Sequence, residues 1–260
     1  MNATRSPRKP AAKAPVARDE SNVERLYFAL RDRAMRYDFK PGSRINEKQL
    51  GEQLGVARAT VREALNRLVA EGLLEFVMNK GFFRKAISVN EVFDLYQVRI
   101  ALERSAVVLA VQRAADEEIA AVKAYWVDVM RRSAQLATAD LVLADEEFHR
   151  RLVALSQNNE LTSFMDIVTR RIHVARHVDI EQLSSWNLQA FDAHMSVIDL
   201  IAQRKADEAL HVLSDHIDIS LKRAVEITKE MVARFFLADG AASLQAVEQA
   251  DRRLQEQLTA

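Results

Sequence analysis

All six histidines of the chain lie beyond residue 140, and some stand where they could share a cation. Asp145 and His149 are four residues apart, so on a helix both project from one face. His194 and His216 fall in two later segments, and their apolar neighbours direct those faces toward a core. A histidine in such a place is either hydrogen-bonded within the core or a metal ligand, and the residues alone leave both interpretations open.

The other histidines have simpler interpretations. His173 and His177 form a second pair at this spacing, which could be solvated, lie at the rim of a pocket or bind another ion. His211 lies about 140° around its helix from His216, so we expect it to face away from any ion that His216 binds.

A second group of residues is basic and lies near the N-terminus. Arg58 and Arg62 are four residues apart, opposite an apolar helical stripe, and Thr60 shares the first turn. Further cations lie on the preceding segment and on a predicted hairpin: Arg44, Lys48, Lys80, Arg84 and Lys85. Positive groups on three converging elements favour binding of DNA over a merely solvated basic face.

Composition narrows the class of protein. Of 260 residues 49% are apolar and 28% charged, as in soluble globular proteins, and no apolar run could span a membrane. Cysteine is absent, which excludes disulfides and thiolate sites and fits a reducing cytoplasm. Residues 1–88 carry 18 Lys/Arg and 10 Asp/Glu, whereas 89–260 carry 19 and 27. The chain therefore divides into a basic part suited to a polyanion and an acidic part that is not.

The basic part predicts a winged helix-turn-helix over 21–88, after a disordered basic arm over 1–20. A helix is expected from about Ser21, a second over 46–54 with Leu50 and Leu54 facing inward, and a third over 57–71. Gly55 should end the second helix. The runs 73–77 and 82–86, joined by Met78-Asn79-Lys80-Gly81, read as a hairpin.

The acidic part predicts an all-α antiparallel bundle over 89–235, so the fold class is mainly α. From Phe82 onward there is no proline and one glycine, Gly240. We expect six helices in this bundle, over 90–114, 116–137, 140–156, 160–178, 185–203 and 206–235. A C-terminal helical extension is expected over 236–260.

The N-terminal segment resembles the DNA-binding domain of the GntR family of bacterial transcription regulators. The matching residues are Pro41-Gly42, Glu47, Leu50, Leu54-Gly55-Val56, Arg58, Val61-Arg62-Glu63-Ala64-Leu65, Leu68, Glu71-Gly72-Leu73 and Gly81. The resemblance implies that Arg58, Thr60 and Arg62 contact operator DNA, with Lys48 alongside and Gly81 at the wing tip. Ala57 stands where the family commonly has Ser or Thr, which removes a helix N-cap worth about 1 kcal/mol.

Residues 90–235 resemble the helical FCD effector domain of the FadR-type branch of that family. The matching residues are Arg99 and Glu103, Asp145-x2-Phe148-His149, Ser156-Gln157-Asn158, His194 and His216, with Gln157 and Asn159 replacing a common Gly and Pro. The resemblance implies that Asp145, His149, His194 and His216 are metal ligands. Such a nitrogen-rich set suits Zn²⁺ first, and otherwise Ni²⁺, Fe²⁺ or Mn²⁺.

An effector carboxylate could take an open position on this ion. Arg99 could hold that carboxylate bidentately, or it could instead form an intrahelical ion pair with Glu103. Asn158 and His173 are further candidates for contact with the effector.

The sequence thus predicts a homodimeric, ligand-responsive transcription factor of the repressor type, acting in the bacterial cytoplasm on a palindromic operator. Its effector would be a small organic acid bound beside the metal. One alternative is a metalloenzyme tethered to DNA, in which Glu146 or Glu147 would serve as base although both point away from the face of Asp145. Another is a regulator whose metal is purely structural.

Overall fold

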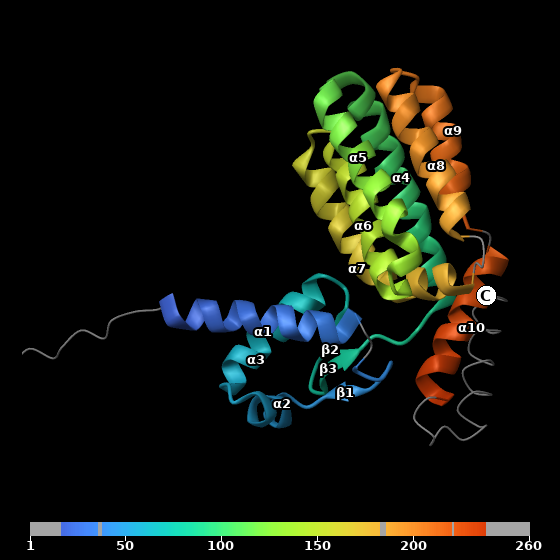
Figure 1. Cartoon of the computed structure of the whole chain (residues 1–260). Coiled ribbons are helices and arrows are strands. Elements are labelled where there is room, and N and C mark those ends of the chain that lie inside the picture. The colour runs from blue at the N-terminus through green and yellow to red at the C-terminus, as the bar shows by residue number, and fades with distance from the viewer. Residues whose placement is uncertain (1–16, 36–37, 183–185, 220, 238–260) are drawn as a thin grey trace, which may run out of the picture.

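The computed structural model describes residues 17–35, 38–182, 186–219 and 221–237. A small N-terminal domain of helices and a sheet lies below an upright bundle of helices, and α7 reaches the junction between them (Figure 1). Among the described residues, every helix is too short or too polar to span a bilayer.

The N-terminal domain is a winged helix-turn-helix, as predicted. Its elements in chain order are α1 (Ala17–Met35), β1 (Arg44–Ile45), α2 (Glu47–Leu54), α3 (Arg58–Ala70), β2 (Leu74–Val77) and β3 (Gly81–Arg84). The three strands form an antiparallel sheet in the order β1-β3-β2. Strand β1 was not predicted, because two residues are too few to show the alternation that marks a strand.

The turn between α2 and α3 follows from local chemistry. The side chain of Asn46 caps α2 by accepting from the backbone N–H groups of Lys48 and Gln49. Gly55 ends α2 in the left-handed region at φ 66°, where glycine has no steric penalty. Ala57 precedes α3 without a side-chain cap, as its missing hydroxyl predicts.

Two predictions for this domain need correction. Leu54 was expected to face inward, but it is 40% exposed, whereas Leu50 is 5% exposed. Leu50 belongs to the hydrophobic core of this domain, whereas Leu54, the last residue of α2, lies outside it. The predicted arm was too long, because α1 already begins at Ala17; the rest of that arm, 1–16, lies outside the described residues.

The bundle contains one helix more than predicted. Its helices are α4 (Val89–Arg113), α5 (Asp116–Arg132), α6 (Thr138–Ala154), α7 (Asn159–Gln182), α8 (Trp186–Ala202), α9 (Ala206–Ile217) and α10 (Leu221–Leu237), with a short 3-10 helix at Ser133–Gln135.

The prediction of one helix over 206–235 is wrong because the chain is extended at Asp218. Helix propensity favours continuation there, but α9 packs on α8 and α4 while α10 packs on α4 and α7, so tertiary contacts require a bend. The predicted extension beyond Leu237, with its expected helix, lies outside the described residues.

A matched pair of substitutions on α2 tests this packing. We expect Leu50→Ala to lower the free energy of unfolding by about 2–4 kcal/mol, because it leaves a cavity in the core. Leu54→Ala should cost less than about 1 kcal/mol, because that side chain is already partly hydrated. Urea denaturation of both variants measures the difference, and equal losses would show that the packing of α2 is wrong.

Candidate metal centre

Three helices bring one carboxylate and three imidazoles together in the core of the bundle. Asp145 and His149 come from α6, His194 from α8 and His216 from α9, and one ligand atom of each lies within 4.8 Å of all the others. The Nε2 atoms of His149 and His194 are 3.1 Å apart. Asp145 Oδ1 lies 3.8 Å from the first of these nitrogens and 3.6 Å from the second.

The local sequence explains why these polar groups point inward. On α6, Asp145 and His149 interrupt a buried stripe formed by Leu141, Val142, Phe148 and Leu152. On α8, His194 shares its face with buried residues of the next turns and stacks on Phe148, with ring centroids 4.0 Å apart. Burial of the apolar neighbours therefore carries the ligand atoms into the core.

A second carboxylate fixes the tautomer of His149. Glu103 Oε2 lies 2.6 Å from Nδ1 of His149, and both side chains are fully buried. Burial and the neighbouring His149 and Arg99 act oppositely on Glu103, and the net effect lowers its pKa, so it accepts the hydrogen bond as a carboxylate. Nδ1 therefore carries a proton, and Nε2 is the ring nitrogen that lies toward Asp145 and His194.

The other two imidazoles are held neutral. Burial, with His216 and His149 nearby, holds the pKa of His194 well below its usual value. Burial, with His149 nearby, lowers the pKa of His216 to about 3. Neutral imidazoles are the form that binds metal ions.

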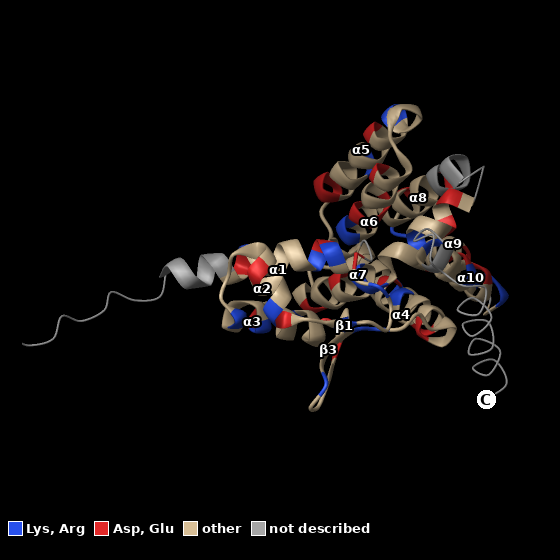
Figure 2. Cartoon of the chain, turned by 90° about the horizontal axis from the view of Figure 1, so that it is seen from below, with Lys and Arg blue, Asp and Glu red and all other residues tan. Residues whose placement is uncertain are grey.

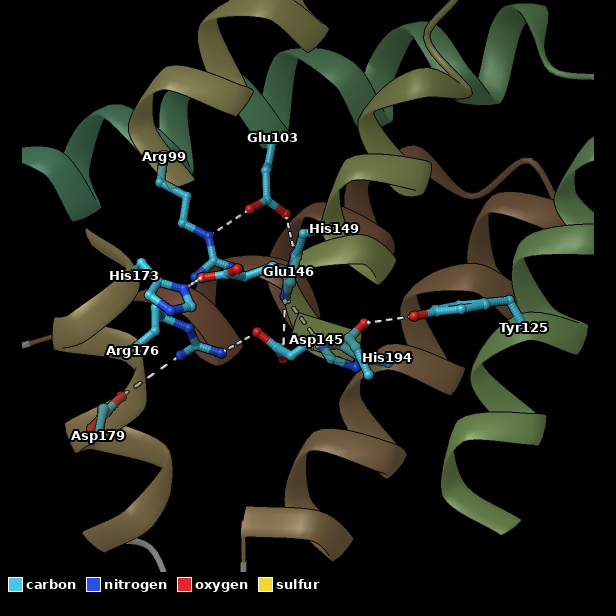
Figure 3. Close-up of polar contacts among 11 residues, drawn as sticks. Arg99, Glu103, Tyr125, Asp145, Glu146, His149, His173, Arg176, Asp179 and His194 are labelled. Atoms are coloured by element: carbon cyan, nitrogen blue, oxygen red, sulfur yellow. Dashed lines mark hydrogen bonds and ion pairs between the residues drawn. The ribbon is translucent and has the colours of Figure 1, made fainter. Parts of the chain in front are cut away.

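Arg176 of α7 completes the cluster, as Figure 3 shows. It donates to Asp145 Oδ2, and Asp179 lies 3.7 Å from its other terminal nitrogen. Burial raises the pKa of Asp145, but Arg176 and the histidines outweigh it and hold that carboxyl ionised. Oδ1 of Asp145 is buried without a hydrogen-bond partner.

The geometry fits a divalent transition metal. Ligand atoms around a tetrahedral ion lie about 3.3 Å from one another. The separations among Asp145, His149 and His194 are 3.1, 3.6 and 3.8 Å. The unpartnered Oδ1 and one ring nitrogen from each of the three imidazoles lie within 4.8 Å of one another. A cation among them would satisfy a buried carboxylate oxygen that the described chain leaves unpaired.

Sequence reasoning missed Arg176 as part of this cluster. A signal was present, because Arg176 and Asp179 share a helix face with Ile172, which is 2% exposed. An oppositely charged pair three residues apart on a buried face indicates a paired internal charge.

The predicted effector residues have different surroundings. Arg99 is 2% exposed and donates from Nε to Glu103 Oε1 over 2.8 Å, so the intrahelical ion pair is present. The ring of His173 lies 2.8 Å from Glu146. Asn158 caps α7 through its side-chain oxygen, which accepts from the backbone of Glu160 and Leu161. Among the described residues, no hydrogen bond or ion pair joins Asn158 to the cluster, so its role toward an effector stays a prediction.

Two further predictions concern residues near the cluster. His211 is exposed and pairs with Asp215 at 3.4 Å, which confirms that it faces away from His216. Gln157, which replaces a common glycine, adopts φ 53° and so keeps the left-handed turn despite its side chain. Its side chain donates to the carbonyl of Arg113 at the end of α4.

The basic residues of the N-terminal domain gather on α3 and on the β2–β3 hairpin (Figure 2). Most of those predicted to meet DNA are exposed, namely Arg44, Lys48, Arg58, Arg62 and Lys80. Arg58 lies 3.1 Å from Glu47, and the guanidinium of Arg62 lies over the ring of Phe76. Gly81 has φ 95°, which a residue with a side chain rarely adopts.

Three residues of this group lie differently from the prediction. Thr60 is only 9% exposed, because it packs into the domain beside Val61, so little of its side chain can reach a groove. Arg84 is buried and donates to the Leu73 carbonyl within the domain. Lys85 donates to Glu91 of α4 and thus faces the bundle.

Comparison with known proteins agrees with this division of the chain. Residues 22–83 match the family described as "Bacterial regulatory proteins, gntR family", and residues 94–219 match the FCD domain. The Nta operon transcriptional regulator of Aminobacter aminovorans is 40% identical over 205 residues, which is 78% of this chain and 94% of that protein.

Two solved structures share the fold. Escherichia coli McbR/YncC aligns with a TM-score of 0.61 at 19% identity, over 84% of this chain and 98% of that one. A GntR transcriptional regulator from Rhodococcus sp. RHA1 aligns with a TM-score of 0.62 at 23% identity, over 80% and 97%.

A winged helix-turn-helix joined to a helical domain with a buried Asp/His₃ cluster defines a class of DNA-binding transcription regulator. Within that class, the chain belongs to the GntR family, in the FadR-type branch with an FCD effector domain. The matching domains and relatives are those of regulators and not of enzymes, so the metalloenzyme alternative is set aside.

Removal of two imidazoles tests the ligand set. We expect His194→Ala combined with His216→Ala to abolish stoichiometric metal binding, because only one imidazole and one carboxylate would remain. His211→Ala, on the same helix as His216 but exposed, is the matched control and should keep full metal content. Elemental analysis of the purified proteins measures this, and normal metal in the double variant would show that other residues bind the ion.

Proposed function

We propose that the protein is a ligand-responsive repressor, which binds a palindromic operator as a homodimer and senses a small organic acid at a metal-containing pocket. The observation that carries this proposal is the cluster of Asp145, His149, His194 and His216 inside one domain, which is joined to a winged helix-turn-helix domain with exposed basic residues. A regulator that acts on DNA in this way would work in the bacterial cytoplasm, on nucleoid DNA.

The exposed arginines of α3 support the assignment of the DNA contacts. Arg58 and Arg62 project from the exposed face of the second helix of the helix-turn-helix, which enters the major groove in proteins of this architecture. Lys48 from α2, together with Arg44 and Lys80 from the sheet and wing, would contact phosphates. Gly81 would allow the wing tip to approach the backbone of the duplex.

The four clustered residues would hold a divalent transition metal, with Zn²⁺ the best match to three imidazoles and one carboxylate. When bound, the ion supplies a Lewis acid with room for an anionic ligand. The guanidinium groups of Arg99 and Arg176 lie on the same side of the cluster (Figure 3), where they could orient a carboxylate. His173 lies near that side, hydrogen-bonded to Glu146.

The effector would act by favouring one relative placement of the dimer's two DNA-binding domains over another. A ligand shifts such an equilibrium only when it binds one of the two placements more tightly. A palindromic operator requires two such domains related by a twofold axis, which a homodimer supplies. The competing proposal is a purely structural ion. It has some support in the near-complete burial of the cluster.

Substitution of one residue that is proposed to contact a base tests the DNA-binding role. We expect Arg62→Ala to weaken specific operator binding by about 1–3 kcal/mol without loss of folding, because it removes a contact to a base edge. The control is Arg131→Ala, which removes an equal charge from an exposed site on α5. Fluorescence anisotropy with operator and unrelated DNA measures both, and unchanged operator affinity in Arg62→Ala would refute the groove assignment.

Native mass spectrometry of protein purified without added metal tests the effector proposal. We expect a dimer that carries one transition-metal ion per chain and a small acid that is lost together with the ion on chelation. Thermal unfolding after chelation distinguishes the structural alternative. In that case the domain would unfold without the ion, and no carboxylate would compete for the site.

A further inference from the structure

Two carboxylates at the junction of the domains are each held by an arginine from α7. Arg170 Nε lies 3.2 Å from Glu71 Oε2, and Arg171 Nη2 lies 2.5 Å from Glu91 Oε1. Glu71 caps the C-terminus of the recognition helix α3, and Glu91 lies in the first turn of α4. Two neighbouring residues of α7 thus bind both the C-terminal end of α3 and the first turn of α4.

Each carboxylate is also bound from the DNA-binding domain. Tyr27 of α1 donates its hydroxyl to Glu71, and Lys85, just after β3, donates to Glu91 over 3.0 Å. All of these side chains are partly buried: Arg170 and Glu71 are 20% and 18% exposed. They form two small ionic networks that cross the domain junction, which we call the junction ion pairs (Tyr27, Glu71, Lys85, Glu91, Arg170 and Arg171).

Gly72 allows the close approach on which this contact depends. It follows Glu71 directly and has φ 73°. A Cβ added there would lie 3.2–3.3 Å from the guanidinium end of Arg171, which is tighter than an ordinary van der Waals contact. The absence of a side chain therefore lets Arg171 lie against the backbone just beyond the recognition helix.

The same helix reaches the metal centre within two turns. Arg176 of α7 donates to Asp145, and His173 contacts Glu146. Six residues separate Arg170 from Arg176, so the two contacts are about 9 Å apart along the helix axis. A helix is stiff over this length, so a shift of α7 at the cluster also displaces the groups that hold Glu71.

An ordinary surface ion pair contributes little and would carry no such role. The junction ion pairs differ because they are partly buried and because they join elements distant in sequence. The net effect of burial, Arg171 and Lys85 is to lower the pKa of Glu91, so this carboxylate is charged in the contact.

We propose that Arg170 and Arg171 are positioning residues for operator binding. They hold the recognition helix in one orientation relative to the bundle, and α7 transmits a change at Asp145 to that helix. The positioning role goes beyond the proposed function, whereas the transmission through α7 rests on the proposed metal centre.

A charge exchange tests the positioning role. Arg170→Glu and Glu71→Arg should each lower the ratio of operator affinity to non-specific affinity about tenfold, and the double exchange should restore it to within about threefold. Arg131→Glu makes the same charge change at an exposed site on α5 and should leave the ratio unchanged. Arg170→Lys, which keeps the charge, should retain most of the ratio and covers the case in which a reversed variant fails to fold.

Two results would overturn the positioning role. One is single variants that behave like Arg131→Glu. The other is a folded double variant whose affinity ratio is reduced by the sum of the two single effects. The loss would then not come from breaking the Arg170–Glu71 pair, because restoring that pair would not recover binding. Circular dichroism and the unfolding temperature establish folding in each case.

Zinc titration of the chelated protein tests the transmission. Zn²⁺ should raise the unfolding temperature of the wild type and change its operator affinity at least threefold. In Arg170→Glu the rise should persist while the change in affinity is lost. A wild type that is stabilised by Zn²⁺ with unaltered operator affinity would contradict transmission. No stabilisation at all would instead refute the metal centre, and transmission with it, but not the positioning role.

Discussion

The buried carboxylate of Asp145 is the constraint around which the effector domain is arranged. An ionised carboxylate inside a protein is costly unless charges and hydrogen bonds compensate it. Arg176 compensates one oxygen, and the other lies among imidazole nitrogens without a hydrogen-bond partner. A divalent cation at this point accounts for both the ionised acid and the three imidazoles gathered around it.

This requirement explains the packing of the surrounding helices. The ligand atoms come from α6, α8 and α9, while α4 and α7 supply the groups that orient and balance them. A rotation of any of these helices by one residue would carry its polar group about 100° away from the cluster. Each of these helices therefore has one rotation about its axis that brings its polar group to the cluster. Because α7 also meets Glu71 and Glu91, the placement of the DNA-binding domain depends on the same helix.

The sequence revealed the parts of this arrangement that depend on local pattern. The spacing of Asp145 and His149 places both on one face, and the distribution of glycine and proline separates the winged domain from the bundle. The ligand set itself came from the family resemblance. What failed depends on tertiary contact. Leu54 has the right spacing but is 40% exposed, and the bend at Asp218 has no glycine or proline. Arg176 is buried with its guanidinium on Asp145, a residue 31 positions earlier in the chain.

Anomalous X-ray diffraction from crystals of the protein with Zn²⁺ bound tests the central claim most directly. We predict one strong peak per chain, bounded by Asp145 Oδ1 and by one nitrogen from each of His149, His194 and His216, at about 2.0–2.2 Å. A peak at other residues, or no peak among these four, would contradict the account.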